Sequence, residues 1–367
     1  MINKQGLYHI LDFVLQRMDG YEANVTVEAT SEGLTRFGNS EINKNVHEDL
    51  VKVTLLCSDG KRRTRVTAST IDKQALSQLI HEAKARLKQM PEQVDNLELV
   101  SAPQEISADY FNEELAAALQ VEQRAHLIKQ ALEVITDRNY KGFGSLSHIE
   151  FQTVVGNTRG IRRYHRGNSA TFTALASCDG GRSPGSTRIT STKLGDLDVQ
   201  AAMRRAFNKA LLNRDQADLD VGSYTIIMEP LAVSDILAFL GAIAFNGPAV
   251  QAGSSMLTGK FGQKVFSEKI SIRDDWTDSN TLPIPFDLEG APKRVVPIIT
   301  KGVAEGVVYD LESAAKAGVE TTGHATGPLS WGLVPHNLIM ANGEKPLEQM
   351  IAETDRGLLV SRFHYVY

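Results

Sequence analysis

The stretch HIEFQTVVGNTRGIRRYHRGNSATFTALASC, residues 148–178, decides the fold class. It contains two strand-like runs, rich in β-branched and aromatic residues, on either side of a turn at Asn157–Gly160. A turn this short joins antiparallel neighbours. Upstream, residues 23–30 and 50–57 alternate between apolar and other side chains with a period of two. The sequence therefore predicts a sheet built from long antiparallel strands.

Apolar residues at helical spacing accompany these strands. The spacing predicts helices at residues 5–18, 72–89, 113–136, 198–212 and 234–245. The last is apolar around most of its circumference, so we expect it to be buried. The predicted class is α+β: an N-terminal α/β region with antiparallel strands and flanking helices, followed by a mostly β C-terminal domain with a buried helix.

Polar, proline-punctuated segments suggest where the chain divides. We expect an N-terminal α+β domain at 1–105, a middle α+β domain at 106–217 and a C-terminal β-rich domain at 218–367. The turn Asp59-Gly60 predicts a hairpin within the first of these. The basic run KRRTR beside it is typical of a solvated strand end.

Composition excludes several classes of protein. The chain has 367 residues and a net charge of −5, which disfavours binding to nucleic acid through a broad basic surface. Its longest apolar run is about half of what a membrane span needs. Two cysteines, Cys57 and Cys178, allow one disulfide but form no disulfide framework. With no signal-peptide pattern at the N-terminus, the expected location is the cytoplasm.

His81-Glu82 is the first half of a zinc-protease signature. An HExxH site needs a second histidine four residues on, where the chain has Ala85, and the longer HExxxH spacing meets Arg86. On a helical wheel His81 falls away from the apolar face. We therefore interpret the pair as part of a solvated helix surface.

Other polar residues could bind a ligand but have simpler explanations. Asp274, Asp275, Asp287 and Glu289 could hold a cation, although acidic residues near Pro and Gly more often form turns. His324, in the loop TTGHATG, is the most interesting remaining histidine, and a structural role is favoured for it. The same holds for His364. GRSPGST lacks a Walker lysine and predicts a hairpin tip.

Three stretches in order resemble one family. LTRFGNSEINKNV (34–46) resembles its N-terminal signature, and SSMLTGKFGQKVFSEKISIRDD (254–275) resembles its Gly-Lys-x-Gly segment leading into paired aspartates. PFDLEGAPKRVVPIITKGVAEGVVYDLESAAKAG (285–318) resembles its Phe-Asp-x-Glu-Gly strand and the turn that follows. The family is TldD/PmbA, also called modulators of DNA gyrase.

The resemblance implies a peptidase built from two related subunits, of which the TldD type carries a His-Glu-x-x-x-His helix. Here Leu240 and Phe245 occupy the positions of the imidazoles, and Gly241 replaces the general-base glutamate. Leu and Phe offer zinc no lone pair, and Gly cannot accept a proton. No cysteine follows Cys178, so a C-terminal thiolate ligand is also missing. The pattern resembles the metal-free TldE (PmbA) branch.

The resemblance therefore predicts a TldE/PmbA-like non-catalytic subunit of a zinc metallopeptidase acting on unfolded peptides. We expect no cofactor in this chain, and zinc in a TldD-like partner. This chain would form a heterodimer with that partner, or a homodimer with a second copy of itself. An unfolded peptide could add to an open strand edge as an extra β-strand. Candidate contact residues are Arg36, Asn39, Ser40, Asp274, Asp275 and His324.

Two alternatives stay open from the sequence: an active metal-dependent peptidase with an unrecognised site, and a homodimeric peptide-binding scaffold. Family members continue well beyond the strand RFHY, near which this chain ends. We therefore expect the C-terminal domain to lack the usual extension.

Overall fold

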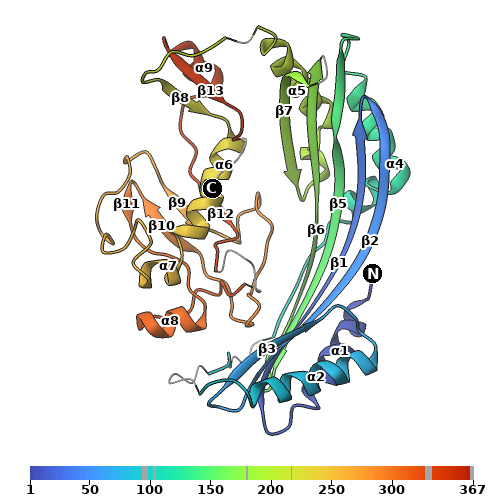
Figure 1. Cartoon of the computed structure of the whole chain (residues 1–367), viewed down its shortest axis with the longest axis vertical. Helices are drawn as coiled ribbons and strands as arrows, with labels where there is room; N and C mark the ends of the chain where they lie inside the picture. Colours follow the sequence, from blue (N-terminus) through green and yellow to red (C-terminus); the bar gives the residue numbers. More distant parts are fainter. Residues whose placement is uncertain (93–97, 102–104, 179–180, 216, 327–332, 364–367) are drawn as a thin grey trace.

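The fold was analysed in a computed structural model that describes residues 1–92, 98–101, 105–178, 181–215, 217–326 and 333–363. Within these ranges the chain combines helices with antiparallel sheets, which confirms the α+β prediction. A long, curved sheet forms one side of the molecule, and the C-terminal region faces it (Figure 1). His364 lies outside the described residues, as does part of the segment before GRSPGST.

The large sheet takes strands from both halves of the N-terminal region. Among the described residues its order is β3-β2-β1-β5-β6-β4, and β7 also pairs with β6. These strands are β1 (Glu22–Gly38), β2 (Glu41–Ser58), β3 (Arg63–Ala68), β4 (Ile106–Tyr110), β5 (Tyr140–Asn157), β6 (Arg162–Cys178) and β7 (Arg182–Ser191). Because β1 pairs with β5, residues 1–105 and 106–217 share one sheet. Their division into two domains stays a proposal.

The β1–β2 hairpin is longer than the sequence predicts, because the polar stretch between residues 30 and 50 continues both strands. Its turn is Asn39-Ser40, with φ of 52° and 63°. Two consecutive left-handed residues match the twist of a two-residue hairpin. The Ser40 hydroxyl accepts the Gly142 N–H at 3.0 Å, which fixes the turn against β5.

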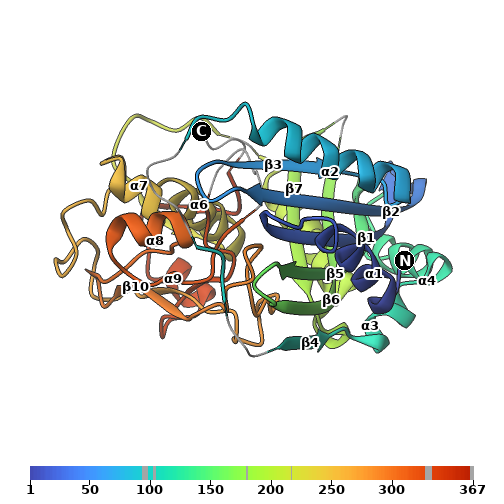
Figure 2. The same ribbon diagram turned by 90° about the horizontal axis from the view of Figure 1, so that it is seen from below.

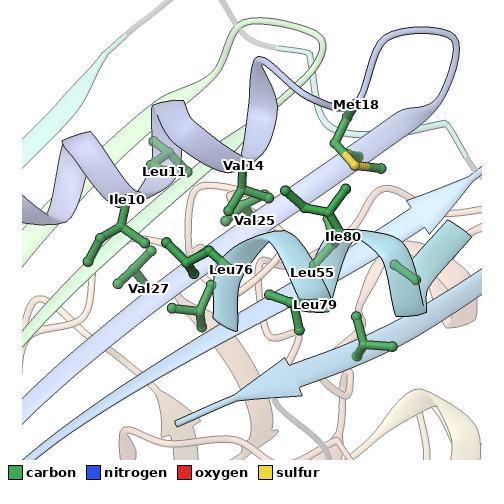
Figure 3. Packing of buried hydrophobic residues seen from close by; sticks show 14 of the residues in the cluster. Ile10, Leu11, Val14, Met18, Val25, Val27, Leu55, Leu76, Leu79 and Ile80 are labelled. Carbon is green, nitrogen blue, oxygen red and sulfur yellow. The ribbon is translucent and has the colours of Figure 1, made fainter. Parts of the chain in front are cut away.

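Two helices pack on the outer face of the sheet near β3. They are α1 (Lys4–Leu15) and α2 (Lys73–Leu87), and their apolar stripes meet the sheet in one buried cluster (Figure 3). The residues of α2 that the helical wheel places inside are buried: Leu76, Leu79, Ile80, Ala83 and Leu87. His81 is exposed, and Glu82 pairs with Arg86 at 2.5 Å. The solvated-surface interpretation of His81-Glu82 is confirmed.

A second helical layer covers the other end of the sheet. It consists of α3 (Glu113–Ala118), α4 (Val121–Leu132) and α5 (Val199–Leu212). The prediction of one helix at 113–136 is wrong, because Leu119 leaves the helical region at φ −121° and Gln120 is extended. The buried core beneath includes Ile128, Phe172 and Met203.

The C-terminal region holds short strands and short helices. A small sheet has the order β11-β10-β9-β12, and β13 pairs with β8 in parallel. The strands are β8 (Thr225–Met228), β9 (Ile272–Asp274), β10 (Val296–Thr300), β11 (Val303–Ala304), β12 (Leu338–Met340) and β13 (Gly357–Val360). The helices are α6 (Pro230–Ile243), α7 (Gly247–Gln251), α8 (Leu311–Ala317) and α9 (Leu347–Ala352).

The structure differs in two respects from the expectation that residues 234–245 form a buried helix. Helix α6 begins at Pro230, where a proline suits the first turn, and ends at Ile243. Most of its side chains are only half-buried, and Ile243 is 54% exposed. One side of α6 packs on the small sheet while the other faces solvent. The helix is therefore only partly buried, although apolar residues cover most of its circumference.

The C-terminal region docks on the inner face of the large sheet, as a view from below also shows (Figure 2). The Leu288 carbonyl accepts hydrogen bonds from Asn24 at 3.0 Å and from Thr26 at 3.1 Å. Gly290 has φ of 81°, and a Cβ there would lie 2.1 Å from a side-chain carbon of Ile161. Only glycine permits this close approach.

Candidate functional site

A cavity of about 490 Å³ lies where the inner face of the sheet meets the C-terminal loops. Period-two alternation directs Glu28 and Thr30 of β1 toward it, while Val27 and Ala29 join the core on the other face. The sheet side also includes Lys52, Phe151, Thr153 and His165, and the loop side includes Ile284, Phe286, Asp287, Lys293, His324 and His336. This size is within the range of small-ligand sites.

Asp274 and His324 form a buried pair in the wall of the cavity. His324 Nε2 lies 2.9 Å from Asp274 Oδ1, and its Nδ1 lies 2.9 Å from the Thr322 carbonyl oxygen. The other carboxylate oxygen of Asp274 accepts the Asn337 N–H at 2.7 Å. Burial alone would raise the pKa of Asp274, but the hydrogen bond from His324 and the charge of Lys293 hold it below its usual value. The pair joins β9 to a distant loop.

Lys293 is a buried base beside this pair. It is 6% exposed, and its Nζ donates to Asn337 Oδ1 at 2.9 Å. Burial lowers its pKa, and the charges of Asp274 and Asp287 oppose that effect. An ammonium has three donors, so this single bond among the described residues leaves Lys293, which lines the cavity, with unused donor capacity.

Asp287 and Glu289 organise a loop that borders the cavity. Asp287 accepts the backbone N–H groups of Ala325 at 2.8 Å, Ala291 at 2.9 Å and Glu289 at 3.0 Å. Glu289 accepts the Leu311 N–H at 3.1 Å, at the start of α8. Burial raises the pKa of both carboxyls. Their hydrogen bonds are those of a turn and a helix terminus, as acidic residues near Gly often make.

His165 and Arg163 bring buried nitrogen atoms from β6 to the same face. The His165 ring lies edge-on to Phe151 and to Phe286, with centroids 5.6 and 5.2 Å apart. Its Nδ1 is buried without a hydrogen-bond partner in the described structure. Burial, and then the charge of Lys293, lowers the pKa of His165 to about 4. Arg163 donates from Nε to the Gly290 carbonyl at 3.3 Å.

The positions that the resemblance assigns to a zinc motif lie behind this wall. A Cβ on Gly241 would lie 3.1 Å from Pro335 Cγ and 3.2 Å from Leu338 Cδ1. Phe245 is fully buried in the C-terminal core, and Leu240 packs against the same core. Side chains of Leu, Gly and Phe carry no metal-binding atom, so these residues do not fit a zinc ion.

The structure brings only part of the predicted contact set together. Asp274 and His324 meet in the cavity wall, while Asp275 lies next to them and accepts hydrogen bonds from Arg273 at 3.0 Å and from Thr277. Arg36, Asn39 and Ser40 lie at the tip of the β1–β2 hairpin and do not line the cavity. Their role in contacts with peptide or partner stays a prediction.

Sequence analysis missed Lys293 and His165. Lys293 follows the FDLEG motif directly, in GAPKR, and alternation along β6 puts His165 on the face opposite Tyr164. Neither pattern distinguishes a cavity residue from an ordinary one. In the described part of the chain, no three His, Cys, Asp or Glu side chains cluster so as to hold a metal ion.

Comparison with known proteins agrees with this architecture. Residues 221–366 match the family described as PmbA/TldA metallopeptidase C-terminal domain. The chain is 31% identical to uncharacterized protein MJ0231 of Methanocaldococcus jannaschii over 138 residues. This aligned stretch makes up 37% of this chain and 32% of that protein. It is 26% identical to the metalloprotease TldD homolog of Haemophilus influenzae over 174 residues. This aligned stretch makes up 46% of this chain and 36% of the relative.

Solved structures share the fold. TldE from Thermococcus kodakarensis superposes with a TM-score of 0.87 at 20% identity, covering 98% of this chain and 83% of that chain. A putative modulator of a DNA gyrase from Thermotoga maritima gives 0.83 at 22% identity, covering 97% and 82%. The chain therefore shares the fold of these two structures.

The C-terminal region thus matches the PmbA/TldA family, and the chain is similar to TldD/PmbA proteins, in agreement with its three motifs. The matched stretch spans about a third of the length of the curated relatives, 32% and 36% for the two named above. Among the described residues, no helix has the length and apolar character needed to cross a membrane.

Proposed function

We propose that this chain is a TldE/PmbA-like, non-catalytic subunit of a TldD/TldE-type zinc metallopeptidase that acts on unfolded peptides. The observation that carries the proposal is the end of α6. Leu240, Gly241 and Phe245 stand where the resemblance places two zinc ligands and a general base, and Phe245 is fully buried. The zinc and the general base would then come from a TldD-like partner.

The open edge of β2 supports a role in holding peptide. Strand β3 pairs only with residues 53–58 of β2. In the described structure, residues 41–52 of β2 pair on one side alone, with β1. An extended peptide could add there through backbone hydrogen bonds, a mode that tolerates many sequences. Such a peptide would end near Lys52, which lines the cavity.

Co-purification tests the proposal. The tagged chain, captured from native extract at endogenous level, should bring down a second chain bearing a His-Glu-x-x-x-His helix. Mixing the two purified chains should give chelator-sensitive cleavage of an unfolded substrate. Capture of a second copy alone would favour the homodimeric scaffold and contradict the proposal.

A further inference from the structure

The cavity contains a charged group whose bonding is incomplete. Lys293 is 6% exposed, and among the described residues its Nζ makes one hydrogen bond, to Asn337. Within the described residues Lys293 forms no ion pair, although the charges of Asp274 and Asp287 act on it from further away. A buried ammonium without a close counter-ion is costly, because desolvation is not offset by a short ion pair. An anionic ligand in the cavity would supply that counter-ion.

The acids around Lys293 are already engaged by the wall itself. Asp274 accepts from His324 and from the Asn337 N–H, and Asp287 accepts from three backbone N–H groups. On the sheet side Glu28 pairs with Lys52 at 2.5 Å. Glu28 Oε2 makes no hydrogen bond among the described residues, but its charge is paired, whereas Lys293 has no ion pair there.

His165 supplies a second nitrogen-bearing group opposite Lys293. It is 3% exposed, lines the cavity, and sits between the rings of Phe151 and Phe286. The charge of Lys293 adds to burial in lowering the pKa of His165, so the two groups are close enough to interact electrostatically. A bound anion would reverse that contribution. His336 also lines this space.

We propose that the cavity binds a carboxylate group of a peptide, with Lys293 as its counter-ion and His165 as a second donor. The walls formed by Phe151, Ile284 and Phe286 would take an adjoining apolar side chain. This inference rests on the proposed peptide-handling function and names the part of the peptide that is recognised. The carboxylate could be the C-terminus or an acidic side chain, since the two share the same chemistry.

Calorimetric titration of the full chain distinguishes these sources. The probes are acetyl-Ala-Phe-Leu with a free C-terminus, the same peptide with a C-terminal amide, and acetyl-Phe-Glu-amide, which has only a side-chain carboxylate. The free acid should bind about 10-fold or more tightly than its amide, because only the acid can make a charge-assisted contact with Lys293. Tight binding of the third probe would assign the site to acidic side chains. Equal binding of acid and amide, or no binding of any probe, would overturn the proposal.

Two variants locate the contact. Lys293→Met keeps the stem and removes the charge, so it should reduce acid binding about 10-fold and leave amide binding unchanged. Lys209→Met is the matched control. Lys209 is a partly buried lysine on α5 that pairs with Glu229 and does not line the cavity. It should bind like the parent. If Lys293→Met fails to fold, His165→Phe, which keeps an aromatic ring, serves in its place. It should reduce the factor by which the free-acid peptide binds more tightly than its amide. Undiminished acid binding by folded Lys293→Met would contradict the proposal. These titrations need no partner, so their failure is separable from failure to find a TldD-like chain.

Discussion

His324 Nε2 lies 2.9 Å from Asp274 Oδ1, and neither side chain has any exposed area. The pair spans 50 residues of sequence and fixes the loop that carries His324 to strand β9. Asn337, whose N–H donates to the same carboxylate, links the opposite side. This network holds His324 in the cavity wall, and breaking it has measurable consequences.

Replacing Asp274 by Asn should strongly destabilise the fold. The amide oxygen can keep the bond from the Asn337 N–H, but the buried negative charge that faces His324 and offsets the charge of Lys293 is lost. Breaking a buried pair of this kind costs about 3 kcal/mol of unfolding free energy. Asp275→Asn is the control, at a neighbouring carboxylate whose side chain keeps 14% exposure, and should cost about 1 kcal/mol. Urea unfolding measures both, and equal costs would contradict the assigned role of the pair.

Stability should fall between pH 6.5 and pH 4 because of His165. Burial lowers its pKa in the folded state from 6.5 to about 4. As the pH falls, His165 is therefore protonated first in the unfolded chain. The free energy of unfolding decreases until His165 is protonated in the folded state as well. At pH 5 the loss from this group is about 2 kcal/mol relative to pH 7. His165→Gln should remove that part of the pH dependence in parallel urea titrations, whereas an unchanged profile would show that His165 does not titrate this way.

Two glycines offer a matched test of the sheet geometry. Both have positive φ, but a Cβ on Gly60 meets nothing within 4 Å, whereas one on Gly144 would lie 2.0 Å from the Thr173 carbonyl oxygen. Gly60→Ala should cost about 1 kcal/mol from backbone strain alone. Gly144→Ala should cost several times more, roughly 3 kcal/mol or above, because backbone must also move. Similar melting temperatures for the two variants would mean that β5 and β6 are less closely apposed there.

Restoring a zinc motif should not restore an enzyme. The triple variant Leu240→His, Gly241→Glu, Phe245→His places polar groups in the C-terminal core, each costing roughly 1–3 kcal/mol if unpaired. The new glutamate would press on Pro335 and Leu338. We expect a lower melting temperature than the parent, no rise on adding zinc, and no peptidase activity. Ile243→His, at a 54% exposed position of the same helix, should be close to neutral. Zinc-dependent activity in the triple variant would place this chain nearer to an enzyme.

Local patterns predicted local structure well. The buried face of α2 follows from five apolar residues at helical spacing, and the hairpin turn at Asp59-Gly60 follows from its residues. The continuation of β1 and β2 through residues 30–50 was missed, because the exposed part of β2 lacks an apolar alternation that a core would require. The break between α3 and α4 is a single turn that periodicity cannot resolve.

The candidate site could not be predicted as a unit. Its walls come from β1, β2, β5 and β6 and from loops around Phe286 and His324, which only long-range pairing brings together. His324 was recognised as the histidine of interest, and Asp274 as an acid near a turn, but their contact is tertiary. Lys293 and His165 were missed because what marks them is a shortage of hydrogen-bond and ion-pair partners in the folded structure, which the sequence does not reveal.

The zinc content of the purified full chain, measured after expression with added zinc, tests the central claim most directly. If Leu240, Gly241 and Phe245 truly stand in place of a zinc site, the chain alone should hold zinc far below one ion per molecule. Stoichiometric zinc that a chelator removes together with peptidase activity would show that this subunit carries its own metal centre, and the account would be wrong.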